Sequence, residues 1–431
     1  MGNWKKTTPG EETIAAYVGI DWADKEHEVR MLVVETARQE SFKLKQEGEA
    51  LAEWVASLRE RFPGGKVVIA VEQRKGALIY ALMNYDFLIL YPVNPKTLAC
   101  YREAFHTSGA KSDPDDAQLL LDLILKHREK LRAWIPEDAN TRLLAMLVED
   151  RRGLVDEVTR LTNRLGSTLK QYFPQALEWA GELNSAQAVD FLMRWPTLGS
   201  VRKAGEASLK KFYQQHGVRN HDKIEERLKA MIAARELTTD RAVLTASKMK
   251  VQATVRQLRV LLKSIAEMEE RIDELFTEHR DHEVFSSFPC AKKVLGPRLL
   301  AAFGGDRSRY GSALEMQTFS GIAPVTKSSG ASRTVHKRNA CPKFLRQTFH
   351  EYAGQSIKKG GWARVYYEGM RERGMKHHAA VRSLAYKWVR IMYRCWQEQE
   401  PYDEAKYLDS LKRHSSPLAS ACWTPKAEAE V

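Results

Sequence analysis

The chain has 431 residues, and its Lys and Arg outnumber its Asp and Glu by 13. With 43% hydrophobic residues and ten Trp it has enough apolar side chains for folded cores, which argues against a disordered chain. No stretch approaches the roughly 18 uncharged apolar residues of a membrane span, and MGNWKKTTPGEE at the start lacks the apolar segment of a secretory signal. We therefore expect a cytoplasmic protein with no membrane partner. Five scattered Cys without CxxC spacing predict neither a disulfide framework nor a structural zinc site.

The first 135 residues alternate between short apolar strands and amphipathic helices. Strands are predicted at residues 17–23, 29–36, 67–72 and 87–94. Helices are predicted at residues 47–62 and 76–84, with a third that starts at Asp113. This order is typical of a mixed sheet with helices on its faces, so residues 1–135 are predicted to form an α/β domain.

Residues 136–285 change to long stretches with a heptad-like apolar stripe. The first stripe runs through residues 144–172 and the second, more regular one through residues 251–275, with a break between them that contains Pro174 and Pro196. Both stretches are highly charged outside the stripe, as the solvated faces of coiled coils are. We predict two long helices that fold back on each other as an antiparallel hairpin or pair across subunits. Ordinary core-facing helices are the alternative, mainly for the first stripe.

The third part of the chain is strongly basic, since residues 286–397 contain 21 Lys and Arg but only 5 Asp and Glu. Such an excess, interleaved with aromatic residues, is typical of a polyanion binder, although a generally basic surface is the alternative. A basic, Ser- and Gly-rich loop is predicted over residues 325–338. Helices are predicted at residues 295–304, 313–324, 341–354 and 381–397, and a polar tail at residues 401–431.

Two strands of the predicted sheet end on a carboxylate, Asp21 on the first and Glu72 on the third. A single residue of this kind is usually satisfied in a turn or cap, because burying an unpaired charge is costly. Together with the aspartates of KSDPDDAQLL (111–120), they predict four carboxylates at one edge of the sheet, where cations have to separate them. This spacing predicts a ribonuclease H-like site with two Mg²⁺ ions for phosphodiester chemistry.

The aspartate cluster also has a purely structural interpretation. Asp113 can cap a helix and Pro114 suits the first turn, where the helix dipole favours further acidic residues. On such a helix Asp113 and Asp116 share a face, whereas Asp115 is turned away from both. Asp113 and Asp116 are therefore the predicted metal ligands, and Asp115 is predicted to be a solvent-facing acid.

Several segments resemble the DEDD insertion-sequence transposases. GIDWADKEH, AVEQ and KSDPDDAQLL stand in the order of that family's D, E and D-x-x-D motifs. FSGIAPVTKSSGASRTVHKRNACPKFLRQTFHEYA is similar to the family's C-terminal transposase domain, and RGMKHHAAVRSLAYKWVRIMYRCW is similar to its closing helix. The resemblance covers both ends of the chain. Members of this family are recombinases with a RuvC-like domain, a coiled-coil insert and a catalytic serine, and they are guided by a bridge RNA.

The resemblance implies roles for five residues. Asp21, Glu72, Asp113 and Asp116 would bind Mg²⁺, for which Mn²⁺ can substitute, and Ser329 of the Ser-Gly pair would form a phosphoserine link with DNA. The preceding Ser328 leaves the position of the nucleophile open by one residue. The resemblance also implies target and donor DNA and a structured guide RNA as partners. It further implies a dimer that assembles into a tetramer, in a bacterial, nucleoid-associated protein.

Basic side chains in and after the predicted loop are the candidate nucleic-acid contacts. Those near Ser329 can neutralise phosphates. Those of the last predicted helix alternate with aromatic residues, so this helix either contacts nucleic acid or is a core helix with a basic outer face. The candidates are Lys327, Arg333, His336, Lys337, Arg338, Lys343, Arg346, Lys387, Arg390 and Arg394.

The predicted fold class is α/β plus α, with a RuvC-like mixed-sheet domain (1–135), antiparallel coiled-coil helices (136–285) and a mainly helical, basic C-terminal transposase domain (286–400). The leading functional prediction is an RNA-guided recombinase of an insertion sequence, in which base pairing supplies sequence specificity. A Mg²⁺-dependent, structure-selective endonuclease that hydrolyses DNA without a serine is the alternative enzyme. A non-catalytic, basic nucleic-acid-binding scaffold is the third interpretation.

Overall fold

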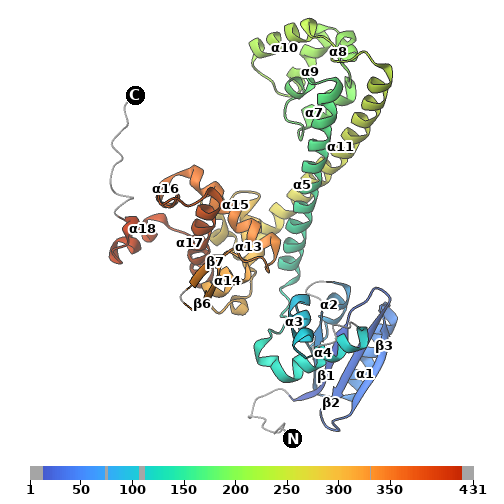
Figure 1. The fold of residues 1–431 in the computed structure, drawn as a ribbon, viewed down its shortest axis with the longest axis vertical. Coiled ribbons are helices and arrows are strands. Elements are labelled where there is room, and N and C mark those ends of the chain that lie inside the picture. The colour runs from blue at the N-terminus through green and yellow to red at the C-terminus, as the bar shows by residue number, and fades with distance from the viewer. Residues whose placement is uncertain (1–12, 73–75, 106–111, 331, 420–431) are drawn as a thin grey trace. The chain divides into compact units, whose positions relative to one another are not determined.

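A computed structural model describes residues 13–72, 76–105, 112–330 and 332–419. The chain divides into two compact units, residues 1–136 and 137–431, and each is described by itself. The first unit carries a five-stranded sheet, and the second is mainly helical (Figure 1).

The sheet of the first unit is mixed. Its strands are β1 (Ile14–Asp21), β2 (Glu26–Val33), β3 (Gln39–Lys45), β4 (Lys66–Val71) and β5 (Leu88–Pro92). They lie in the order β3-β2-β1-β4-β5. The β1–β2 and β2–β3 pairs are antiparallel, and the β1–β4 and β4–β5 pairs are parallel. The predicted mixed α/β architecture of this part of the chain is therefore confirmed.

Helices pack on both faces of this sheet. They are α1 (Gly48–Arg61), α2 (Ala77–Leu82), α3 (Pro95–Phe105), α4 (Asp113–His127) and the short η1 (Arg128–Lys130). α1 and α2 share a core with Ile20 and Ile69, whereas α3 and α4 share one with Val68 and Ala70. β4 is apolar almost throughout because its side chains point alternately into these two cores.

One strand and one α-helix of this unit are missing from the sequence-based prediction. β3 is an edge strand in which only Leu44 is buried, so it lacks the apolar run that predicts a strand. α3 begins at Pro95, directly after the predicted strand 87–94, and proline suits the first turn of a helix.

Two long helices, α5 (Ala139–Tyr172) and α11 (Arg241–Glu278), lie side by side in the second unit (Figure 1). The start of α5 meets the end of α11, because Thr141 contacts His279 and Arg151 pairs with Glu269. The helices are therefore antiparallel, and the predicted hairpin forms within one chain. Coiled-coil supercoiling and pairing across subunits stay predictions.

A compact group of helices connects α5 to α11. Its members are α6 (Ala176–Trp179), α7 (Ala186–Arg194), α8 (Leu198–Ala204), α9 (Glu206–Gln215) and α10 (His221–Ala233). They enclose an aromatic core that includes Trp179, Phe191 and Phe212. The prolines that predict a break in this region mark ends of helices: Pro174 follows the cap of α5, and Pro196 precedes the Thr197 cap of α8.

The remaining helices form the C-terminal part of the second unit. They are α12 (His282–Ser286), α13 (Leu295–Phe303), η2 (Arg307–Arg309), α14 (Ala313–Phe319), α15 (Lys343–Lys359), α16 (Gly361–Glu372), α17 (His377–Glu398) and α18 (Glu404–Arg413). Their common core includes Phe303, Phe349 and Trp388, and Leu144 of α5 joins it. α18 lies in the segment predicted to be a polar tail, and its Tyr407 packs against this core.

The predicted loop over residues 325–338 is wrong in one respect, because most of it forms a β-hairpin. β6 (Val325–Ser329) pairs with the antiparallel β7 (Ser332–His336). All but one of the ten paired residues of the hairpin are exposed, so it has no alternating apolar face. For this reason its strands could not be predicted from the sequence pattern.

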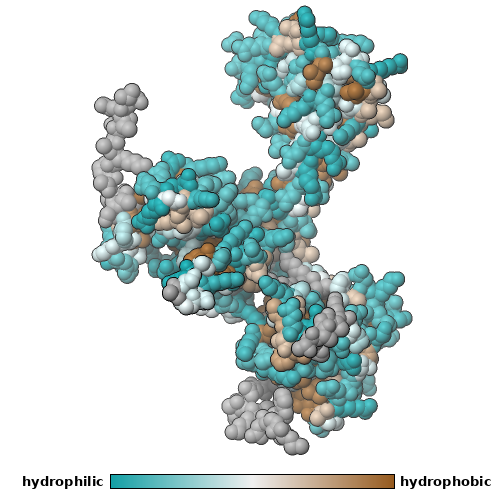
Figure 2. All heavy atoms as spheres, viewed as in Figure 1, coloured by the Kyte–Doolittle hydropathy of each residue, from teal (hydrophilic) through white to brown (hydrophobic). Residues whose placement is uncertain are grey.

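The visible surface is mainly hydrophilic, with apolar residues in small scattered patches (Figure 2). None of the described helices combines the length and the apolar character that crossing a bilayer requires.

Candidate functional site

The first predicted metal ligands come from adjacent strands. β1 and β4 are parallel, and Ile20 is the register partner of Val71. Asp21, the last residue of β1, and Glu72, directly after β4, therefore come next to each other at the same edge of the sheet. The apolar strands preceding both residues fix the positions of their backbones, because those strands are buried.

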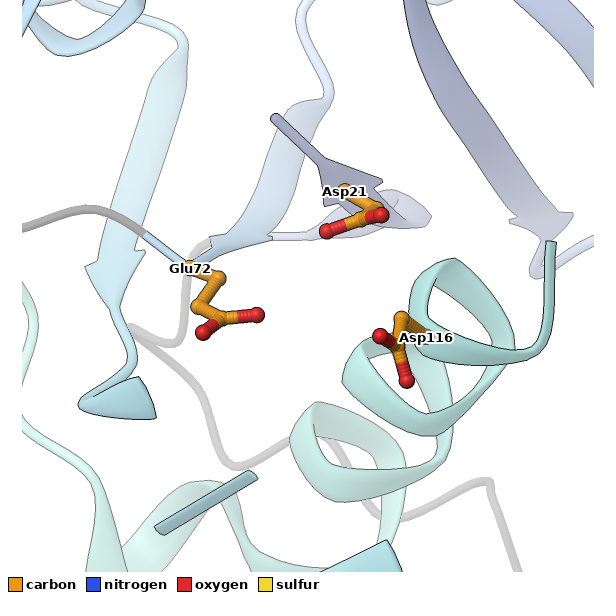
Figure 3. A group of neighbouring side chains, drawn as sticks. All are labelled: Asp21, Glu72 and Asp116. Atoms are coloured by element: carbon orange, nitrogen blue, oxygen red, sulfur yellow. The ribbon is translucent and has the colours of Figure 1, made fainter. Parts of the chain in front are cut away.

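Helix α4 brings the third carboxylate to this edge. Asp116 is completely buried in its first turn. One carboxylate oxygen each from Asp21, Glu72 and Asp116 lies within 4.8 Å of the others, and the side chains point toward a common space (Figure 3). We call these three residues the acidic group. It unites three of the four predicted metal ligands.

Gly19 lets α4 approach the sheet closely enough to build this group. A Cβ atom at Gly19 would lie 2.3 Å from the carbonyl oxygen of Ala117 and 2.5 Å from the backbone nitrogen of Leu121. Only a residue without a side chain therefore fits between β1 and the α4 backbone. Gly19 is two residues before Asp21, and Ala117 directly follows Asp116, so this contact sets the spacing between two members of the acidic group.

The start of α4 differs from the prediction. Ser112, not Asp113, is the N-cap; its hydroxyl accepts the N–H of Asp115 and donates to the Asp115 carboxylate at 2.6 Å. Ser112 thus satisfies one N–H of the first helical turn as an N-cap, and its hydroxyl also holds the Asp115 side chain. Asp115 is exposed, as predicted, and it is not a member of the acidic group; that it takes no part in metal binding stays a prediction.

Asp113 is the first residue of α4 and is exposed. It lies one turn before Asp116 on the same side of the helix but is not a member of the acidic group. Its role as a fourth metal ligand stays a prediction.

An arginine that the sequence did not single out contacts the acidic group. Arg102 of α3 donates from Nε to Oδ1 of Asp116 at 2.8 Å, and its Nη2 donates to the same oxygen. No spacing rule connects residues 102 and 116, and α3 itself was not predicted. Only the tertiary fold places this guanidinium beside the group.

The acidic group fits a hard divalent cation. Its donor atoms are all carboxylate oxygens, which Mg²⁺ and Mn²⁺ prefer over nitrogen or sulfur ligands. Three carboxylates at this separation repel one another, and a cation between them relieves that repulsion. The donor set is therefore consistent with the predicted magnesium site.

A buried histidine holds the turn that follows Asp21. Nδ1 of His27 accepts the N–H of Ala23 at 3.1 Å, so its Nε2 carries the proton and donates to Oε1 of Gln46 at 2.5 Å. His27 is completely buried, and this burial lowers the pKa of its imidazole below the ordinary value. The neutral ring therefore ties the turn between β1 and β2 to the end of β3.

Ser329, the predicted nucleophile, belongs to the second unit. It is the last residue of β6, is exposed, and precedes Gly330, whose φ of 54° lies in the left-handed region that favours glycine. Ser329 pairs with Ser332, and Ser328 pairs with Arg333. Because side chains alternate along a strand, Ser329 shares a face with Lys327, and Ser328 lies on the opposite face.

Nine of the ten basic residues predicted to contact nucleic acid fall into two classes, and Lys387 is described with helix α17 below. Arg338 and Arg346 close the base of the hairpin: Nε of Arg338 donates to the Ala323 carbonyl, and Nη1 of Arg346 donates to the Arg338 carbonyl. The exposed candidates are Lys327, Arg333, His336, Lys337, Lys343, Arg390 and Arg394. Contact of either class with nucleic acid stays a prediction.

Helix α17 is a core helix with a basic outer face, one of the two predicted alternatives. Its Trp388 and Trp396 are buried, whereas Arg390 and Arg394 are exposed. Lys387 is half-buried with its ammonium 4.9 Å from the Tyr366 ring centroid, and burial lowers its pKa. The two tryptophans therefore pack in the core of this part of the second unit.

Comparison with known proteins gives matches in both the N-terminal and the C-terminal part of the chain. Residues 18–174 match the DEDD transposases of the IS110 type, and residues 282–368 match the transposase IS116/IS110/IS902 family. The mini-circle putative transposase for IS117 of Streptomyces coelicolor is 27% identical over 93% of this chain and 98% of its own length. A 42 kDa protein of insertion element IS900 from Mycobacterium paratuberculosis is 25% identical over 90% of this chain and 97% of its own. A 44.8 kDa protein of insertion element IS116 from Streptomyces clavuligerus is 27% identical over 78% of this chain and 84% of its own length.

Proposed function

From the premise that the chain belongs to the IS116/IS110/IS902 family of transposases, which cleave and rejoin DNA, we propose that it is an RNA-guided recombinase that uses Ser329 as its nucleophile and Mg²⁺ as its cofactor. The observation that carries this proposal is the acidic group at the ends of two parallel strands. Such a group in a RuvC-like, ribonuclease H-like domain has the chemistry for activating phosphodiester bonds.

In the proposed reaction the Oγ atom of Ser329 forms a bond to the phosphorus of a DNA phosphodiester. The bond from phosphorus to one strand breaks, and that strand leaves as a hydroxyl that takes up the serine proton. A hydroxyl of the strand to be joined later attacks the phosphoserine and releases Ser329. The phosphoserine conserves the bond energy, so rejoining needs no further energy source.

Asp21, Glu72, Asp113 and Asp116 would hold the Mg²⁺ ions, which neutralise charge that develops on the reacting phosphate. Gly19 and His27 keep the backbone around Asp21 in place. The fully buried carboxylate of Asp116 is oriented before DNA arrives, so little reorganisation is needed during the reaction.

The hairpin register supports Ser329 over Ser328 as the nucleophile. Lys327 and His336 lie on the face of Ser329, since the alternation from Lys327 to Ser329 and from Ser332 to His336 puts all four on one side. A DNA phosphate attacked by Ser329 would thus meet two further groups that can bind it. Ser328 shares its face with Arg333 and with Val335, which is 63% exposed.

Guide RNA and an oligomer are part of the proposal. The excess of 21 basic over 5 acidic residues in 286–397 suits several phosphate backbones at once. Base pairing with a guide would then supply the sequence specificity. A dimer that assembles into a tetramer would bring Ser329 of one protomer to the acidic group of another.

The test is formation of a covalent protein–DNA species that survives denaturation, measured with the chain, its co-purified RNA and both DNA substrates. We expect Ser329→Ala and Asp116→Asn to abolish it, whereas Ser328→Ala and Asp115→Asn retain it. If Ser329→Ala still cuts DNA and only joining is lost, the hydrolytic endonuclease is the correct reading. If RNA that co-purifies is random in sequence, the guided part of the proposal is wrong.

A further inference from the structure

We propose that Arg102 is a positioning residue of the acidic group. Its guanidinium fixes one oxygen of Asp116 and competes with divalent cations for the negative charge of the group, so it weakens metal binding in the absence of DNA. This inference rests on the proposed role of the acidic group as a metal site.

The contact is built into the fold. Nε and Nη2 of Arg102 both donate to Oδ1 of Asp116, so the guanidinium binds a single carboxylate oxygen. The Asp116 side chain is fully buried, and that of Arg102 is 19% exposed. Charge-assisted bonds in such surroundings are stronger than those at the surface, where water and salt screen them.

The positive charge of Arg102 affects how strongly the acidic group binds a cation. A cation that binds the acidic group meets the positive guanidinium next to one of its ligands, and the two repel each other. The same guanidinium stabilises the group when no cation is bound, because it offsets the repulsion among the carboxylates. Arg102 therefore raises the stability of the metal-free protein and lowers its affinity for metal.

A DNA phosphate changes this balance. The phosphate would place negative charge next to the bound cations and so strengthen the binding of cations that the protein alone binds weakly. Arg102 would in this way couple metal loading to the presence of DNA. A transposase with such coupling holds fewer activated metal ions while it carries no substrate.

The experiment compares Arg102→Gln with Arg59→Gln in the full chain. Arg59 is a matched control in the same unit, since it forms an ion pair with Asp86 in which both side chains are exposed, by 64% and 85%. Two quantities are measured without DNA: the unfolding temperature in EDTA, and the dissociation constant for Mn²⁺ from titration followed by electron paramagnetic resonance. Asp116→Asn provides the reference for a lost ligand.

We expect Arg102→Gln to unfold about 5 °C or more below the wild type in EDTA, to bind Mn²⁺ about tenfold more tightly, and to gain more stability from Mn²⁺ than the wild type does. Arg59→Gln should match the wild type in both quantities. Equal or weaker Mn²⁺ binding by Arg102→Gln overturns the inference, even if the protein is less stable. Absence of Mn²⁺ binding by both the wild type and Arg102→Gln would instead refute the metal site and thus the proposed function.

Arg102→Lys covers the case in which Arg102→Gln does not fold. Lysine keeps the positive charge but cannot form the two-bond contact of a guanidinium. We expect its Mn²⁺ affinity to stay within about twofold of the wild type while its unfolding temperature in EDTA falls. An unfolding temperature equal to that of the wild type contradicts the proposed positioning role.

Discussion

Asp116 is fully buried in the first turn of a helix that rests on Gly19 of strand β1, whereas Ser329 lies exposed at the end of the first strand of a hairpin. The acidic group depends on contacts between segments about 50 and 100 residues apart in the chain. The hairpin depends on residues next to each other in the sequence and on two arginines at its base. The two halves of the proposed chemistry should therefore respond differently to mutation. Changes at the acidic group affect stability as well as function, and changes at the hairpin affect function alone.

The largest effect on function is expected at the hairpin. Ser329→Ala should lower strand joining by on the order of 10³-fold or more, since it removes the hydroxyl proposed to attack the phosphate. The unfolding temperature should stay within about 1 °C of the wild type, because the removed atom is exposed. Ser328→Ala is the control and should retain most of the joining activity. Equal losses in the two variants would contradict the assignment based on strand register.

Gly19→Ala tests whether a change at the acidic group lowers both stability and metal binding. The added methyl group would lie 2.3 Å from the Ala117 carbonyl oxygen, so α4 has to shift away from β1. We expect a loss of about 1–3 kcal/mol in the free energy of unfolding together with weaker Mn²⁺ binding. Chemical denaturation and metal titration measure the two effects. Gly48→Ala is the control, because a Cβ atom at Gly48 meets nothing within 4 Å.

His27 makes the stability of the first unit depend on pH. Its pKa in the folded state is lowered by burial, so below the ordinary value of about 6.5 the unfolded chain binds a proton that the folded chain does not. Stability that is present above this pH is therefore lost as the pH falls toward the lowered pKa, by up to about 1.4 kcal/mol per pH unit. Urea denaturation at pH 7.5 and 5.5 should show a smaller difference for His27→Gln than for the wild type. An unchanged difference would mean that other groups cause the pH dependence.

The smallest effects are expected at the helix cap. Ser112→Ala removes the hydroxyl that accepts the Asp115 N–H, and we expect a loss of about 0.5–2 kcal/mol in the free energy of unfolding. Asp115→Asn keeps that hydroxyl contact and should cost less. Both variants should retain catalytic activity, in contrast to Asp116→Asn. Loss of strand cleavage in Asp115→Asn would show that the acidic residues were assigned to the wrong roles.

Much of the fold could be predicted from local patterns. The apolar strands that end at Asp21 and before Glu72 and the two long amphipathic helices all appear close to their predicted positions. β3 and the hairpin could not be predicted in this way, because exposed strands are specified by their pairing partners and not by an apolar pattern. The Asp115 assignment followed from helix geometry alone, whereas the choice of Ser112 as cap depended on where the helix actually begins.

The sequence by itself determined the types of side chain available to the site: carboxylates after apolar strands, an acidic helix start, and a serine before a glycine in a basic segment. The tertiary structure decided which of them meet. Parallel pairing of β1 with β4 joins Asp21 to Glu72, and the close approach of α4 over Gly19 adds Asp116. Arg102 comes to Asp116 from a different helix. These contacts depend on the packing of segments distant in the chain, and a short-range sequence pattern contains no information about that packing.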